Sequence, residues 1–171
     1  ISKSQLQNIY NAGHEIGAHT RTHRDLTTLS QTDQVNEISG SRQDLLAMNV
    51  GPINTFAVPF GEYSDAIITN IKNAGFSNNS VSDGGLNDAL ADRFALARVP
   101  GDKRTTMAQM KQAVDSAAAN KEWLILTFHQ VDNSGNTYSI SPADFNTIID
   151  YIVQKGLPVV TISQGAQALQ Q

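Results

Sequence analysis

The most constraining feature of this sequence is a regular alternation of helical and strand-like segments. Helical periodicity and capping residues predict helices over residues 2–12, 31–48, 65–74, 107–119, 142–155 and 163–169. Short apolar runs between them predict strands over residues 14–18, 55–58, 76–81, 95–99, 123–128 and 157–162. Because parallel neighbours need a crossover connection, this alternation predicts a largely parallel α/β sheet, either a barrel or a doubly wound sheet.

Composition narrows the class of protein. The 171 residues, of which 40% are apolar, predict a single domain over residues 1–171. A net charge of -4 offers no basic surface for nucleic acid, and no apolar run approaches the roughly 18 residues of a membrane span. With no cysteine, disulfides and thiolate chemistry are excluded. No glycine-rich phosphate loop or Gly-x-Ser-x-Gly elbow follows a predicted strand, which disfavours a nucleotide site and a serine hydrolase.

Histidines fall at the ends of predicted strands. His19 and His23 follow the strand over 14–18, and His129 follows the strand over 123–128. In parallel α/β proteins the carboxyl ends of the strands carry the residues that do chemistry. If residues 19–23 form a helical turn, the two side chains share a face about 5–6 Å apart at Cβ, which is metal-ligand spacing. We therefore predict a divalent metal site at His19 and His23 with His129 as a proton donor; solvated histidines are the alternative.

Three motifs in a fixed order carry a family resemblance. They are the run Gly13-His14-Glu15-Ile16-Gly17 leading into His19-Thr20-Arg21-Thr22-His23, then Pro59-Phe60-Gly61, then Leu124-Ile125-Leu126-Thr127-Phe128-His129. A sequence with these motifs resembles the polysaccharide deacetylases of the NodB-homology class, carbohydrate esterase family 4, over essentially the whole chain. The resemblance implies an α/β fold of the NodB type, a parallel-strand (β/α) barrel-like architecture.

The resemblance also implies roles for individual residues. In that family the histidine pair binds a divalent metal, usually zinc, which gives this role to His19 and His23, with Thr20 steadying the loop. The family's late histidine protonates the leaving amine, a role that maps onto His129. The resemblance further implies substrate contacts by Pro59, Phe60, Gly61, Leu124 and Leu126, of which the two leucines line the acetyl pocket.

Two departures from the family pattern stand out. The family motif Thr-Phe-Asp-Asp-Gly, which supplies a metal-binding and a catalytic-base aspartate, has no match before His19, so we expect an N-terminally incomplete domain without its leading strands. Ala57 stands where the family commonly has arginine, as in the branch that acts on exported poly-N-acetylglucosamine or related polymers. Arg98 is a candidate for that arginine's orienting role, or it makes a surface salt bridge. We expect the loop carboxylates to be caps or solvated turns: Asp83, Asp88 and Asp102.

The sequence therefore predicts metal-dependent hydrolysis of N-acetyl or O-acetyl groups from a carbohydrate polymer such as an N-acetylglucosamine polymer, peptidoglycan or an exopolysaccharide. The resemblance implies a secreted or cell-envelope protein. Two alternatives remain: an inactive glycan-binding relative that has lost the catalytic aspartates, and an unrelated metal-dependent α/β hydrolase or isomerase. Strand edges at residues 14–18 and 157–162 predict pairing with the missing N-terminal segment or with a second copy of the chain.

Overall fold

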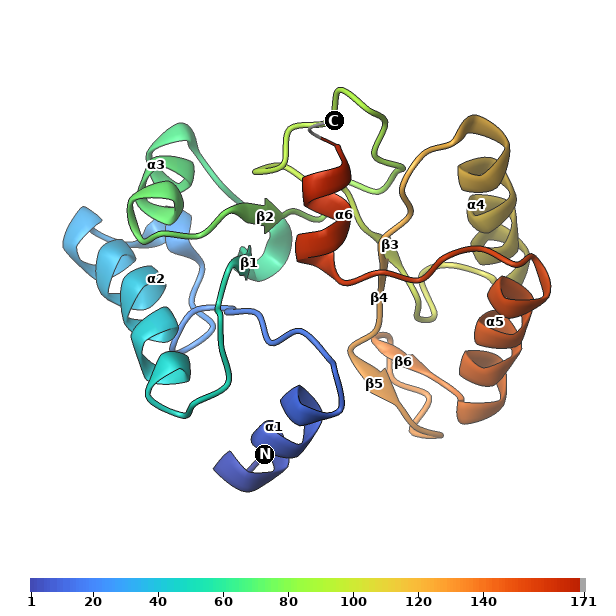
Figure 1. Ribbon diagram of the computed structural model, residues 1–171, viewed down its shortest axis with the longest axis horizontal. Coiled ribbons are helices and arrows are strands. Elements are labelled where there is room, and N and C mark those ends of the chain that lie inside the picture. The colour runs from blue at the N-terminus through green and yellow to red at the C-terminus, as the bar shows by residue number, and fades with distance from the viewer. Residues whose placement is uncertain (170–171) are drawn as a thin grey trace. The chain divides into compact units, whose positions relative to one another are not determined.

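The computed structural model describes residues 1–169, which form two compact units of helices and short strands (Figure 1). Unit 1 comprises Ile1–Val81, Asp92–Leu96 and the described residues from Val160 onward. Unit 2 comprises Ser82–Ala91 and Ala97–Val159. None of the helices in this part of the chain is long and apolar enough to cross a bilayer.

Unit 1 is built around a pair of parallel strands. β1 and β2 pair in parallel, and single parallel bridges extend the arrangement from Phe56 to Ala18 on one side and from Ser80 to Leu96 on the other. Helix α3 makes the crossover between the strands and packs against α2, green beside cyan in Figure 1. The elements of this unit are α1 (Lys3–Asn11), η1 (Leu26–Thr28), α2 (Gln31–Leu46), β1 (Thr55–Ala57), η2 (Pro59–Gly61), α3 (Asp65–Asn73), β2 (Asn78–Ser80) and α6 (Ile162–Ala168).

The core of unit 1 is mainly apolar, but the strand β2 within it is polar. Phe56 of β1 is fully buried between residues of the helices, including Ile38 and Ile67. β2 is polar but equally buried, and its Asn79 amide Nδ2 donates a hydrogen bond to the Phe94 carbonyl at 2.9 Å. A buried amide needs such a partner, so this bond holds the segment before Leu96 against β2.

Unit 2 contains two more parallel pairs. β3 pairs with β4 through the α4 crossover, and β5 pairs with β6. α4 packs against α5 around a second apolar core formed by Met110, Val114, Ile140 and Ile148. The elements are β3 (Val99–Pro100), α4 (Met107–Asn120), β4 (Leu126–Thr127), β5 (Gln130–Val131), β6 (Ser139–Ile140) and α5 (Pro142–Gln154).

The predicted helices are all present, and β1, β2 and β4 lie within predicted strands while β3 overlaps one, but two predicted strands do not form. Residues 14–18 contribute one bridge, at Ala18, instead of a strand. The strand predicted over 157–162 is wrong, because Thr161 caps α6 in a capping box with Gln164 and the helix begins at Ile162. β5 and β6 were not predicted, since their flanking sequence reads as a polar loop.

Candidate functional site

The two predicted metal-binding histidines lie on an irregular loop, which we call the histidine loop (residues 19–23). Thr20 and His23 adopt left-handed backbone conformations, with φ of 64° and 56°, so the expected helical turn is wrong. Thr20 Oγ1 accepts a hydrogen bond from the His23 backbone N–H at 3.0 Å. The loop nevertheless brings the imidazoles of His19 and His23 together, with ring centroids 4.7 Å apart and planes inclined by 75°.

A buried carboxylate on α2, Glu37, fixes the loop between the two histidines. Its Oε2 accepts hydrogen bonds from the backbone N–H groups of Arg21 and Thr22, each at 2.9 Å, and its Oε1 accepts from Thr22 Oγ1 at 2.6 Å. Burial alone would raise the pKa of Glu37, but the hydrogen bonds from Thr22 and Arg21 outweigh it and lower the pKa. An ionised side chain that is only 8% exposed therefore anchors the histidine loop to α2.

The imidazole of His19 is oriented by the backbone at the end of β1. Its Nδ1 lies 2.6 Å from the Ala57 carbonyl oxygen. Because a carbonyl can only accept, Nδ1 carries the proton, and in the neutral imidazole Nε2 then carries the lone pair. A hydrogen bond of this kind is the usual way in which a metal-binding histidine is oriented.

The predicted turn after β1 contacts the histidine loop. The Phe60 ring lies with its centroid 5.0 Å from that of His23, edge to face at 75°. Phe60 itself has a φ of 60°, the third left-handed non-glycine residue in this region after Thr20 and His23. Such conformations cost free energy and cluster at functional sites, where the surrounding structure enforces them.

The donor set of the histidine loop fits a divalent metal. His19 presents Nε2 as a neutral ligand, and the His23 ring lies beside it. A catalytic zinc ion normally takes three protein ligands, and residues 1–169 hold no cluster of three or more His, Cys, Asp or Glu side chains suited to a metal. The described residues of the histidine loop therefore bring together two candidate ligands.

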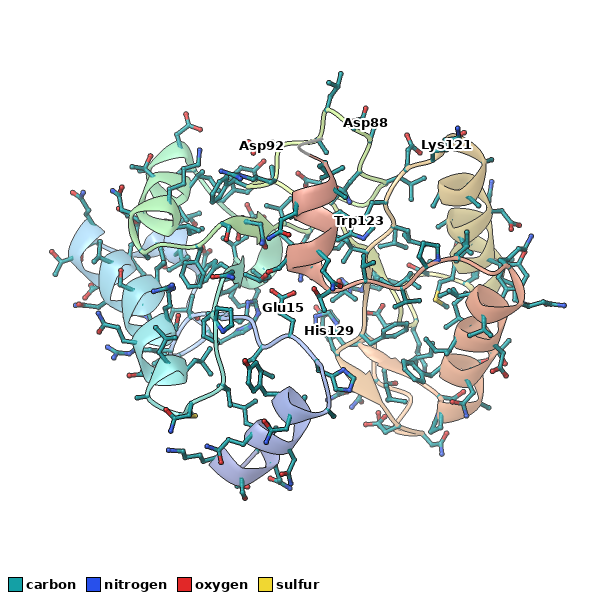
Figure 2. The ribbon with its side chains drawn as sticks, in the orientation of Figure 1. Glu15, Asp88, Asp92, Lys121, Trp123 and His129 are labelled. Atoms are coloured by element: carbon teal, nitrogen blue, oxygen red, sulfur yellow. The ribbon has the colours of Figure 1, made fainter. Side chains whose placement is uncertain are left out.

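In unit 2, the pairing of β3 with β4 places Asp102 beside His129. Pro100 pairs with Thr127 at the ends of the two parallel strands, so the residues two positions further on emerge at the same edge. Asp102 Oδ2 lies 3.6 Å from His129 Nδ1, with the aspartate side chain fully buried and the histidine side chain 49% exposed. His129 is labelled in Figure 2, just before β5.

Gly101 makes this close approach possible. Its backbone N–H donates to the Thr127 carbonyl at 2.8 Å. A side chain at this position would overlap the ring of Phe128, so the Phe128 ring packs directly on the glycine backbone. Asp102 and His129, which directly follow Gly101 and Phe128 in the chain, are thereby brought together.

Asp102 is an ionised, buried group. Burial alone would raise the pKa of Asp102, but the hydrogen bonds from Arg104 and the charges of Arg104 and His129 outweigh it and lower the pKa. Asp102 caps its own turn, as expected, because its Oδ1 accepts from the Arg104 backbone N–H at 3.1 Å, but its side chain is buried and not solvated. Asp88 likewise caps its loop, accepting from the Leu90 backbone N–H at 2.9 Å.

Comparison with known protein families shows which proteins this chain resembles. The model of the polysaccharide deacetylase family matches residues 2–78, which include the histidine loop and the turn after β1. Residues 2–78 are therefore similar to the polysaccharide deacetylases. The resemblance seen in the sequence is confirmed. No curated protein matches the chain.

Solved structures of deacetylases share the fold of this chain. A family 4 carbohydrate esterase from Streptomyces lividans, in complex with acetate, is 23% identical and aligns over 95% of this chain and 74% of its own, with a TM-score of 0.64. The Streptococcus pyogenes deacetylase PplD is 21% identical over 58% of this chain and 44% of its own, with a TM-score of 0.55. The CE4 family pseudoenzyme BA3943 from Bacillus anthracis is 15% identical over 96% of this chain and 50% of its own, with a TM-score of 0.61. The chain thus spans half the length of the last two or less, and the predicted parallel-strand NodB-type fold is confirmed.

The other predicted substrate-binding residues lie in unit 2 of the deacetylase fold. Leu124 and Leu126 are partly buried and pack against the apolar core of that unit. Arg98 lies just before β3, and burial, followed by the charge of Arg104, lowers the pKa of Arg98. The charge of Arg104 thus acts on Arg98, and the orienting role of Arg98 stays a prediction.

Glu15, in the motif that precedes the histidine loop, has a structural role that the sequence did not indicate. Its carboxylate accepts hydrogen bonds from the Ser163 backbone N–H at 2.9 Å and Oγ at 2.5 Å, and from the hydroxyl of Thr55. Figure 2 shows Glu15 directed toward the start of α6. These bonds tie α6 to β1, on the deacetylase core of unit 1.

Proposed function

We propose that this protein is a metal-dependent deacetylase that hydrolyses N-acetyl or O-acetyl groups of a carbohydrate polymer. The observation that carries the proposal is the orientation of His19, whose Nδ1 is held by the Ala57 carbonyl while its ring lies 4.7 Å from that of His23. Paired, oriented imidazoles on a loop after a strand suit a hydrolytic metal site. The family match over residues 2–78 supports deacetylation as the reaction.

His19 and His23 would hold the metal, and zinc is the first choice because it accepts neutral imidazole readily. When bound, the metal supplies Lewis-acid activation of the acetyl carbonyl and of the attacking water. The chain's own contribution is to orient the ligands. The Ala57 carbonyl fixes the His19 ring, and Glu37 fixes the backbone between the two histidines.

His129 is the proposed general acid. Hydrolysis of an amide adds the water oxygen to the acetyl carbon and breaks the C–N bond, so the departing nitrogen must gain a proton. An imidazole titrates close to neutral pH and can deliver that proton. Asp102 lies 3.6 Å from Nδ1, which leaves Nε2 as the proposed donor.

The proposed substrate is an acetylated glycan such as an N-acetylglucosamine polymer, and the proposed location is outside the cell or in the cell envelope. The Streptomyces esterase with the same fold is in complex with acetate, the product that hydrolysis of an acetyl group releases. Pro59, Phe60, Gly61, Arg98, Leu124 and Leu126 are the proposed substrate contacts. Of these, Phe60 is 60% exposed beside His23, where a sugar ring can stack on it.

Acetate release tests this proposal. The whole protein is incubated with N-acetylglucosamine oligomers as prepared, after treatment with a chelator, and after addition of zinc. We expect acetate release that stops on chelation and returns with zinc, and that is absent from His19→Ala and His23→Ala. His14→Ala, which removes an exposed histidine outside the loop, is the matched control and keeps activity. Release that continues in the chelator contradicts the proposal.

A second candidate function is glycan binding without catalysis. It is favoured by the likeness to the Bacillus anthracis pseudoenzyme over 96% of the chain. Under this alternative the protein binds the oligomer, and releases no acetate with or without zinc. The same experiment therefore separates the two functions.

A further inference from the structure

Arg104 forms a bidentate ion pair with the carboxylate of Asp102, which faces His129. Its Nε donates to Asp102 Oδ1 at 2.9 Å, and its second nitrogen donates to Oδ2 at 2.6 Å. The Arg104 backbone N–H also donates to Oδ1, at 3.1 Å. This bidentate contact is the strongest pairing that a guanidinium makes with a carboxylate, and it fixes the plane of the Asp102 side chain.

The oxygen that faces His129 is the one that Arg104 binds most tightly. Asp102 Oδ2 lies 2.6 Å from the guanidinium nitrogen and 3.6 Å from His129 Nδ1, a separation too long for a hydrogen bond. The single negative charge of Asp102 is thus shared between two positive partners. Asp102 interacts more strongly with Arg104 than with His129, because its contacts with Arg104 are shorter and more numerous.

The ring of Tyr138 lies close to both His129 and Arg104. Its ring centroid lies 5.4 Å from that of His129, and the Arg104 guanidinium carbon lies 4.8 Å from the same ring. The charged and titratable groups placed around His129 are Asp102 and Arg104 from the loop after β3 and Tyr138 from the loop before β6. Further out, Arg98 feels the charge of Arg104, and the Lys103 ammonium group bonds the Gly135 carbonyl.

We propose that Arg104 is a positioning residue that withholds part of the Asp102 charge from His129 and so sets the pH at which His129 releases its proton. A buried carboxylate with no other partner would hold the proton of the imidazolium strongly and make His129 a poor acid near neutral pH. By competing for Oδ2 and adding a positive charge, Arg104 offsets this effect. The effect of Arg104 on catalysis rests on the proposed function, but its effect on the protonation of His129 does not.

The two partners have opposite effects on the pKa of His129. Removing the arginine charge leaves Asp102 with His129 as its remaining cation, so the imidazolium is stabilised and its pKa rises. Removing the charge of Asp102 leaves Arg104 to repel the imidazolium, so its pKa falls. Because the His129 side chain is 49% exposed, solvent screens both effects.

Titration of the histidine ring by NMR tests the inference without any substrate. Signals of the isotope-labelled whole protein are followed against pH for the parent, Arg104→Gln and Asp102→Asn, with His129→Ala used to assign the signal. The matched control is Lys155→Gln. Lys155 also pairs with an aspartate, Asp115 at 2.6 Å, and lies 5.0 Å from a tyrosine ring, that of Tyr151, but this cluster contains no histidine.

We expect the pKa of His129 to rise in Arg104→Gln, to fall in Asp102→Asn and to stay unchanged in Lys155→Gln. Arg104→Lys keeps the positive charge but loses the bidentate contact, so the pKa of His129 should rise less than in Arg104→Gln. This variant also tests the inference if Arg104→Gln does not fold. An unchanged or lowered pKa in both Arg104 variants overturns the inference. Failure of the proposed function would instead show as absent acetate release with these shifts intact.

Discussion

The histidine loop and the His129 cluster (Asp102, Arg104, His129 and Tyr138) hold imidazoles in different ways. In the histidine loop the ring of His19 is oriented by a neutral backbone carbonyl, and the loop backbone is anchored by Glu37. In the His129 cluster the ring faces a buried charge that is shared with an arginine. A neutral partner fixes a ring without favouring its protonated form, which suits a metal ligand, whereas a charged partner tunes proton affinity, which suits an acid.

The largest expected effect comes from removing the proposed acid. In the whole protein, His129→Ala should lower turnover on an N-acetylglucosamine oligomer by roughly 10² to 10⁴, the usual contribution of one positioned proton donor. Metal affinity should stay nearly unchanged, because the histidine loop is untouched. Equal turnover in mutant and parent, or loss of metal together with activity, would show that the two regions do not have separate roles.

The anchor of the histidine loop comes next. Glu37→Gln removes the charge and one acceptor while keeping the shape, so we expect a loss of about 1–3 kcal/mol in the free energy of unfolding, as for a buried charged acceptor. We also expect metal affinity to fall by roughly 10- to 100-fold, the usual cost of losing a group that supports a metal ligand. Denaturant titration and zinc titration measure the two effects.

The pH dependence of the same anchor has a defined sign. Because the folded-state pKa of Glu37 lies below its ordinary value of 4.5, the stability it contributes is complete above that value and is lost as the pH falls through the lower folded value. In Glu37→Gln this acid-dependent loss should be smaller than in the parent. Identical acid unfolding of the two proteins would mean that Glu37 does not anchor the loop.

A smaller effect is expected at Gly101 in the His129 cluster. Gly101→Ala places a methyl group into the Phe128 ring and should cost about 1–3 kcal/mol through overpacking. Because the ring neighbours His129 in the chain, the NMR signal of His129 should shift while those of His19 and His23 do not. Gly84→Ala, where a side chain would meet open space, is the matched control.

The smallest effect is expected at the surface of the histidine loop. Arg21 pairs with Asp44 at 2.7 Å, but the two side chains are 41% and 51% exposed. Exposed ion pairs contribute about 0–1 kcal/mol, so Asp44→Asn should change stability and metal affinity little, in contrast to Glu37→Gln. A loss of metal affinity in Asp44→Asn as large as in Glu37→Gln would show that the surface ion pair, and not the buried carboxylate of Glu37, holds the histidine loop in its conformation.

The helices could be predicted from the sequence because their signals are local. The capping boxes at Ser2 with Gln5 and at Thr106 with Gln109 are present as the sequence indicates. The strands could not be predicted as well, because pairing depends on distant partners. The strand predicted over residues 76–81 contains β2, but the burial of its polar residues, Asn78 to Ser80, between β1 and the bridge to Leu96 depends on those partners.

For the candidate site, the sequence indicated which two histidines lie together but not the geometry of their loop. The spacing of His19 and His23 identified a pair that does lie together, yet the left-handed residues of the loop replace the helical turn on which the argument depended. Asp102 was missed because its burial follows from the register of two strands. The available signal was that Asp102 and His129 each stand two residues beyond a strand end, at Pro100 and Thr127.

The central claim is that the histidine loop binds metal and the His129 cluster does not. Zinc titration by calorimetry, with metal content measured on the same samples, compares the parent with the His19→Ala/His23→Ala double variant, His129→Ala and His14→Ala. We expect tight zinc binding in the parent and in the His129 and His14 variants, and its loss in the double variant, with the fold retained by circular dichroism. Stoichiometric zinc in the double variant, or loss of zinc in His129→Ala, would contradict the account.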